Sequence, residues 1–318
     1  AAVTLGAKHT CALLSSGHAK CFGHNGKGQL GLGDKSSRGQ NPKHMGDGLP
    51  YVNGDLGLVQ QIEAGSDITC MLLTDGRVFC FGSGDHGALG YGGTDGRTTP
   101  EEVAGNLRAQ RIAVGAKHAC AVVGDDVYCW GKGANGALGQ GDTENHFSPV
   151  LVRWLSGQGV WDIACGDQSC CALTRGSMAC WGQNSPNGKL GLGHKSDVGD
   201  TPETANLASS LVPGITVQQP AVAPVAAGVP ARGRGLVASA ALRCFVVSGA
   251  LACAGPPVRS HFGAGAQSRT ARLHHPAGWS AAAVGTHHSC AVTGAGSVVC
   301  WGRGSAGQLG LEDGADRH

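Results

Sequence analysis

Residues 115–131 read GAKHACAVVGDDVYCWG, and this stretch decides the fold because the chain repeats it. Related stretches begin at Gly6, Gly65, Gly166 and Gly285, and a weaker copy begins at Ser239. The leading cysteines of the six copies are Cys11, Cys70, Cys120, Cys171, Cys244 and Cys290, so successive copies start 46 to 73 residues apart. A repeat of about 50 residues is typical of a propeller blade.

The pattern inside each copy predicts β-strands. CALLSSGHAKCFG (residues 11–23) indicates two strands joined by a tight turn at Ser16-Gly17, and the other copies carry turn residues at the same place. A third strand precedes each pair, as in VQQIEAG (59–65), and PAVAPVAAG (220–228) is expected to be the inner strand of the fifth copy. Outer strands are expected to follow the prolines of TPEEVAGNL (99–107) and SPVLVRWL (148–155). We therefore expect an all-β chain, a single β-propeller over residues 1–318, with six blades favoured and seven the alternative.

Composition excludes several functional classes. The chain has 55 glycines, 14% charged residues and a formal net charge of +2, which gives no electrostatic footprint for nucleic acid. The longest apolar stretch, residues 236–247, is too short and too mixed to cross a bilayer. We expect neither nucleic-acid binding nor membrane insertion. The opening residues AAV suit the start of a mature secreted chain.

The repeat resembles that of the regulator of chromosome condensation family, whose signature is G-x-x-H-x-x-A-L, then D-G-x-V-x-x-W-G, then G-x-L-G. The matching residues here are Gly115, His118, Ala121 and Val122, then Val127, Trp130 and Gly131, then Gly136, Leu138 and Gly139. The resemblance implies a β-propeller, commonly of seven blades. The added cysteine pairs make the chain similar to the secreted members of that family.

Fourteen cysteines at regular spacing favour disulfides and an oxidising compartment. Nine or ten residues separate the two cysteines of each hairpin, which places them opposite each other on paired strands. The predicted pairs are Cys11–Cys21, Cys70–Cys80, Cys120–Cys129, Cys171–Cys180, Cys244–Cys253 and Cys290–Cys300. Cys165 and Cys170 remain, and we expect a local bridge between them, with free thiols, an interchain bridge or an exchanged partner for Cys180 as alternatives.

Three histidines precede a leading cysteine by two places: His9, His118 and His288. A zinc site is the rival interpretation, but Ile68, Ser169 and Leu242 replace the histidine in the other copies, and Cys-x-x-Cys pairs are missing. We expect no metal and no cofactor. For these histidines, a packing role and a ligand role both stay open.

One aromatic residue follows the second cysteine in five copies, namely Phe22, Phe81, Trp130, Trp181 and Trp301, and Ala254 replaces it in the fifth copy. A large ring at one fixed place in each repeat is expected to pack between neighbouring blades.

Enzyme motifs do not stand out. The chain lacks a nucleophile elbow and a zincin helix, and its paired carboxylates, Glu101-Glu102 and Asp125-Asp126, fall in an outer strand and a hairpin turn. We expect no enzymatic activity. A nucleotide-exchange factor and an enzyme using the propeller mouth are the less favoured alternatives.

The non-repeated parts point to binding. An irregular insert rich in Pro, Ala and Gly covers about residues 204–235. The chain is expected to open inside a blade, at the strand leading to Gly6, and to stop after GQLGLED without a proline-led outer strand. We expect a secreted, extracellular or cell-surface protein that binds another protein or builds an assembly, including one of its own copies. An inhibitor-like module gripping its partner with loop residues such as His86, Asn135 and Asn187 is the alternative. O-linked glycan on the Pro/Ser/Thr-rich parts is compatible with the sequence.

Overall fold

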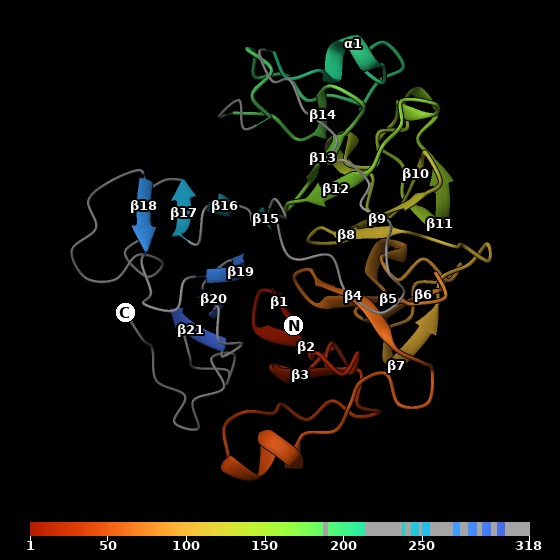
Figure 1. Cartoon of the computed structure of the whole chain (residues 1–318). Helices are drawn as coiled ribbons and strands as arrows, with labels where there is room; N and C mark the ends of the chain where they lie inside the picture. The colour runs from red at the N-terminus through yellow and green to blue at the C-terminus, as the bar shows by residue number, and fades with distance from the viewer. Residues whose placement is uncertain are drawn as a thin grey trace.

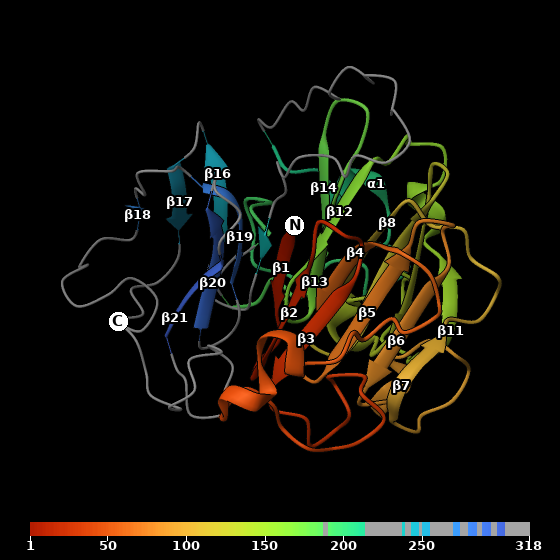
Figure 2. The same cartoon turned by 60° about the horizontal axis from the view of Figure 1, so that its bottom comes forward.

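The computed structural model describes residues 1–186 and 190–213 in full and, beyond them, the backbone of seven strands between Val237 and Gly302. The described strands form six sheets placed around a centre near the N-terminus (Figure 1). In Figure 2, which shows the strands from the side, they run between two faces of the ring.

Every described sheet is an antiparallel meander, and each is one blade. Blade 1 contains β1 (Ala2–Leu5), β2 (His9–Leu13) and β3 (Ala19–Gly23). Blade 2 contains β4 (Val59–Ala64), β5 (Ile68–Leu73), β6 (Val78–Gly82) and β7 (Arg97–Glu102). Blade 3 contains β8 (Arg111–Val114), β9 (His118–Val123), β10 (Asp126–Gly131) and β11 (His146–Leu151). Blade 4 contains β12 (Asp162–Cys165), β13 (Ser169–Leu173) and β14 (Met178–Gly182).

The last two sheets follow the same plan. Blade 5 contains β15 (Val237–Ala238), β16 (Arg243–Val247), β17 (Ala250–Ala254) and β18 (Thr270–Leu273). Blade 6 contains β19 (Trp279–Val284), β20 (His288–Thr293) and β21 (Val298–Gly302). The innermost strands β1, β4, β8, β12, β15 and β19 are neighbours in that order, and β19 lies beside β1. The predicted all-β propeller is confirmed, and the six sheets among the described strands match the six repeats.

Two details differ from the sequence-based expectation. Pro100 and Pro149 lie inside the outer strands β7 and β11 rather than before them, which an edge strand tolerates because one side of its backbone has no partner. The strand paired with β16 is β15 at Val237–Ala238, whereas the expected inner strand of this unit ended at Gly228. The inner strand ends only a few residues before β16 because a short turn joins the two strands.

The remaining elements are short. They are the 3₁₀ turns η1 (Pro42–His44), η2 (Gly46–Gly48), η3 (Asp85–Gly87), η4 (Ala134–Gly136) and η5 (Arg153–Leu155), and the single-turn helix α1 (Leu207–Ser210). Among the described residues, no helix has the length and apolar character that crossing a membrane requires. Of the expected insert, only residues 204–213 are described; the rest of it and Asn187 lie outside the described residues.

The core lies between blades, where an aromatic ring of one blade packs on a Leu-Gly pair of the preceding blade. Trp130 of blade 3 is fully buried against Gly90 of blade 2, and a Cβ added at Gly90 would lie 2.6 Å from its Nε1. Phe81 meets Gly31 in the same way, at 2.8 Å, and Trp181 meets Gly139 at 3.1 Å. Only glycine leaves room for these rings, and each of the three also has a positive φ. The fifth expected aromatic, Trp301, has no described side chain.

Candidate functional site: a pocket between blades 3 and 4

The turns that join the inner strand to the second strand build one face of the ring. In blade 3 the N–H of Gly115 donates to the carbonyl of His118 at 2.8 Å, and blades 1, 2 and 4 form the same turn. Neighbouring turns are bonded to each other: Ala7 donates to Ser66 at 3.1 Å, Ser66 to Ala116 at 3.4 Å, and Ala116 to Asp167 at 3.1 Å. A continuous band of backbone hydrogen bonds therefore links blades 1 to 4 on this face, which we call the turn face.

The first residue of each turn is glycine because the next blade approaches it closely. A Cβ at Gly115 would lie 2.6 Å from the carbonyl oxygen of Gly166, and a Cβ at Gly6 would lie 2.5 Å from that of Gly65. A side chain at either position would push neighbouring blades apart. This glycine therefore recurs in the repeat because packing between neighbouring blades requires it.

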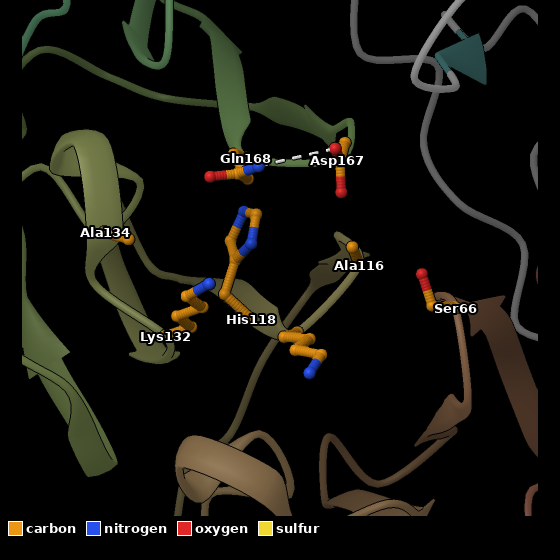
Figure 3. A pocket seen from close by; sticks show the side chains of 8 residues that line it. Ser66, Ala116, His118, Lys132, Ala134, Asp167 and Gln168 are labelled. Atoms are coloured by element: carbon orange, nitrogen blue, oxygen red, sulfur yellow. Dashed lines mark hydrogen bonds between the residues drawn. The ribbon is translucent and has the colours of Figure 1, made fainter.

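A pocket of about 220 Å³ opens on the turn face between blades 3 and 4 (Figure 3). Its lining consists of Ser66, Ala116, Lys117, His118, Lys132, Ala134, Asp167 and Gln168. Lys117 is exposed, whereas His118 is buried, with 1% of its surface accessible. In Figure 3 the His118 ring points toward Gln168, and Asp167 lies beside Gln168 at the opposite wall. Two lysines and one aspartate give this pocket both signs of charge around a histidine.

Two of the three singled-out histidines are buried and reach across to the next blade. The Nε2 atom of His9 lies 2.9 Å from Thr69 Oγ1, and that hydroxyl donates to the carbonyl of Gln29, so His9 carries its proton on Nε2 and donates. Burial, with a smaller contribution from the charge of His24, lowers the pKa of His9 from 6.5 to about 3. His9 is therefore neutral and has a packing role. His288 has no described side chain.

His118 has a different partner. Its Nε2 atom lies 3.2 Å from Cys170 Sγ, and Cys170 Sγ lies 3.7 Å from Cys120 Sγ. Cys170 takes the place in blade 4 that Thr69 takes in blade 2, one residue before the leading cysteine. The extra cysteine pair thus faces the one described histidine that also lines the pocket. Sequence reasoning missed this meeting because it looked for ligands within a unit and not across two units.

All ten described cysteines are in disulfides, with partners on neighbouring strands. The bonds are Cys11–Cys21, Cys70–Cys80, Cys120–Cys129, Cys165–Cys170 and Cys171–Cys180. Each pair is directly opposite in the strand register. In blades 5 and 6 the backbone register sets Cys244 opposite Cys253 and Cys290 opposite Cys300, while their side chains lie outside the described residues.

A second group of polar residues lies on the innermost strands. Glu63 of β4 accepts hydrogen bonds from Gln61 at 3.0 Å and from Thr4 at 3.4 Å. Burial raises the pKa of Glu63 to about 7 against the opposing effect of these hydrogen bonds, and the charge of Asp162 raises it further. Burial also raises the pKa of Asp162, although Arg111 at 3.9 Å counteracts it. This group couples the inner strands of blades 1 to 4 electrostatically.

The other predicted positions separate into two faces. Asn135 donates to Gln168 Oε1 at 2.6 Å and so borders the pocket, and His86 lies in the equivalent turn of blade 2. Asp125 lies in the hairpin turn at the other end of blade 3, where it pairs with Arg175 at 3.2 Å. Glu101 pairs with Arg97 at 3.3 Å. The paired carboxylates considered as acid–base groups therefore include members of exposed ion pairs away from the pocket.

Comparison with known proteins agrees with the repeat and the fold. Profiles of the Regulator of chromosome condensation (RCC1) repeat match residues 75–122 and 125–173, and also 1–29, 59–88 and 279–308, together more than half of the chain. The human E3 ubiquitin-protein ligase HERC2 is 30% identical over 224 residues, which are 68% of this chain and 4% of HERC2. The chain thus spans a small part of that relative.

Solved structures show the same architecture. Human WBSCR16 superposes with a TM-score of 0.61 and 18% identity, covering 100% of this chain and 79% of that one. Prp20p from Saccharomyces cerevisiae, described with its binding to Gsp1p and histones, gives a TM-score of 0.58 and 20% identity, covering 99% of this chain and 74% of that one. These similarities establish a shared fold.

Proposed function

The chain belongs to the RCC1 repeat family, and from this premise we propose that it is an extracellular, disulfide-braced propeller that binds another protein through its turn face. The observation that carries the proposal is the pairing of all ten described cysteines inside single blades. Disulfides persist in oxidising compartments and are rare in the cytosol. A braced propeller without a catalytic motif suits a binding module.

Protein binding is supported by a relative of the same fold. Prp20p is described by its binding to Gsp1p and histones. The ligase activity in the name of HERC2 is not extended to this chain, which spans 4% of that protein. Function follows from a site and not from the fold, so the binding face has to be argued from the residues of this chain.

The turn face is favoured over the opposite face because it combines a rigid backbone with a pocket. Backbone hydrogen bonds between successive turns hold Ala116 and Asp167 in place, so a partner does not have to order this surface. Lys117 and Lys132 at the pocket wall would attract an acidic side chain of the partner. A segment inserting such a side chain between blades 3 and 4 is the interaction that the geometry accommodates.

The test is site-specific photo-crosslinking in extracellular fluid of the source organism. A photoreactive residue replaces Lys117 on the turn face or, as the matched control, Asp125 on the hairpin-turn face; both are exposed residues of blade 3. We expect adducts at position 117 that unlabelled protein competes away and that Lys132→Glu weakens. Adducts at neither position, or only at 125, contradict the proposal. Adducts between two copies would identify self-assembly as the partner interaction.

A further inference from the structure

The cysteine pair that breaks the repeat lies at a three-ligand cluster. Cys165 ends β12 and Cys170 is the second residue of β13, with four residues between them. Their two sulfur atoms and a nitrogen of the His118 ring all lie within 4.8 Å of one another, and all three residues are buried. The cluster is assembled from two blades, so it exists only in the folded propeller.

We propose that the reduced form of Cys165 and Cys170 binds one zinc-like divalent ion together with His118. Structural and catalytic zinc sites use Cys and His ligands with bonds of about 2.0–2.3 Å, and a pair separated by two to four residues is a common ligand spacing. Cys165 and Cys170 have this spacing, whereas the hairpin pairs, with eight or nine intervening residues, do not. His118 supplies an imidazole nitrogen from the neighbouring blade 3.

The pocket borders the cluster through the His118 ring. His118 contributes to the pocket lining while its Nε2 atom contacts Cys170, so the ring separates the cavity from the sulfur atoms. A cavity of about 220 Å³ is large enough for water molecules, each of which occupies about 30 Å³ in the liquid. Three protein ligands and one water molecule is the arrangement of an accessible zinc site. Lys117, which is exposed, and Lys132, which is half-buried, line the same pocket.

The change of state is a balanced redox reaction followed by metal binding. A dithiol reductant transfers two electrons and two protons to the Cys165–Cys170 bond, which breaks into two thiols while the reductant closes its own disulfide. The divalent ion then displaces the two thiol protons, so that two thiolates and His118 bind it. The hairpin disulfide of blade 4, Cys171–Cys180, is not required for this site.

Cys120 offers the reduced pair a competing reaction. Its sulfur lies 3.7 Å from Cys170 Sγ, so a Cys170 thiolate is placed to attack the Cys120–Cys129 bond, forming Cys120–Cys170 and releasing Cys129. That exchange would link blades 3 and 4 covalently in place of the metal. The two outcomes give different peptides and different spectra, so one experiment separates them.

Cobalt(II) is the probe, because thiolate-to-cobalt charge-transfer bands and strong tetrahedral bands report its ligands. The full chain is reduced with a water-soluble phosphine, which becomes its oxide, and is titrated with cobalt and then with zinc as competitor. We expect one equivalent to bind with a thiolate spectrum. Cys165→Ser with Cys170→Ser abolishes it, and His118→Gln weakens it at least tenfold. The double variant Cys171→Ser with Cys180→Ser, and His9→Gln in blade 1, retain it.

Folding of each variant is checked by circular dichroism before titration, and His118→Cys, which restores a third soft ligand, is expected to recover binding. Absence of a thiolate spectrum, or one unchanged in His118→Gln, overturns the proposal. Peptide mapping that finds Cys120 linked to Cys170 after mild reduction also overturns it, in favour of exchange between blades.

Discussion

The indole Nε1 of Trp181 in blade 4 donates a hydrogen bond to the backbone carbonyl of Ala137 in blade 3, at 3.1 Å. The same ring meets Trp154 edge to face, with centroids 5.5 Å apart. One side chain thus joins two blades by packing and by a directed polar contact. The equivalent Trp130 is equally buried, but its Nε1 has no hydrogen-bond partner among the described residues.

This difference predicts that Trp→Phe lowers the free energy of unfolding by different amounts at positions 130 and 181. Trp→Phe removes the indole N–H and part of the ring at both places, but only Trp181 loses a hydrogen bond and leaves the Ala137 carbonyl unpaired. We expect Trp181→Phe to lower the free energy of unfolding by about 1–2 kcal/mol more than Trp130→Phe. Urea denaturation of the two variants measures it. An equal loss of unfolding free energy in the two variants, or a larger loss for Trp130→Phe, would show that the hydrogen bond from Trp181 to Ala137 contributes nothing to stability.

A second prediction concerns the turn glycines. Gly115→Ala places a Cβ 2.6 Å from the Gly166 carbonyl and against the His118 ring, so blades 3 and 4 have to separate. We expect the free energy of unfolding to fall by about 3 kcal/mol or more, because the backbone that the new Cβ would overlap cannot move aside easily. The control is Gly124→Asn, at a φ of 63° with open space around it, which asparagine tolerates. A stable Gly115→Ala variant would refute the blade-contact explanation of this glycine.

A half-buried group, Glu63, and a fully buried group, His9, give opposite dependences of stability on pH. The folded pKa of Glu63, about 7, lies above its ordinary value of 4.5, so the folded state holds the extra proton and stability falls as pH rises from 4.5 to 7. The folded pKa of His9, about 3, lies below 6.5, so the unfolded state holds the extra proton and stability falls as pH drops from 6.5 toward 3. The effects of Glu63 and His9 on stability oppose each other between pH 4.5 and pH 6.5.

Substitution separates the two effects. Glu63→Gln keeps the shape but loses the ionisation, so we expect it to be more stable than the parent above pH 7, by up to about 3 kcal/mol, with the advantage vanishing below pH 4.5. His9→Gln is expected to gain relative to the parent as the pH falls below 6.5. Denaturation midpoints between pH 4 and 8 measure both. Parallel pH profiles for parent and variants would contradict the assigned pKa values.

The hairpin disulfides predict a fourth result. Cys70 and Cys80 close a loop of ten residues and both are fully buried. Replacing both with alanine is expected to cost about 2–3 kcal/mol, chiefly by freeing the unfolded chain. Thermal unfolding without reductant measures the loss. A parent protein whose stability does not change on adding reductant would show that these bonds contribute little.

Much of the fold follows from the sequence because each blade is a local structure. The strands of a hairpin and the cysteines that face each other are set by spacing alone, as with Cys11 and Cys21. The placement of the aromatic residue follows from its position after the second cysteine. Because the same local pattern recurs in each unit, the propeller can be predicted from the sequence.

Contacts between units cannot be predicted from the sequence in the same way. Whether His9 meets a threonine and His118 a cysteine depends on the register of two blades about 50 residues apart, which no single repeat encodes. The pocket between Lys117 and Gln168 has the same origin. The inner strand of blade 5 differs from the expectation because an apolar stretch alone does not predict a strand, whereas the short turn before Arg243 places β15 at Val237–Ala238.

The most direct test of a disulfide-braced propeller is a disulfide map of the protein taken from its natural source. Thiols are alkylated before denaturation, and the peptides are identified by mass spectrometry without reduction. We expect no alkylation at the ten described cysteines and the links Cys11–Cys21, Cys70–Cys80, Cys120–Cys129, Cys165–Cys170 and Cys171–Cys180. Alkylated cysteines in the hairpins would contradict both the brace and the extracellular placement.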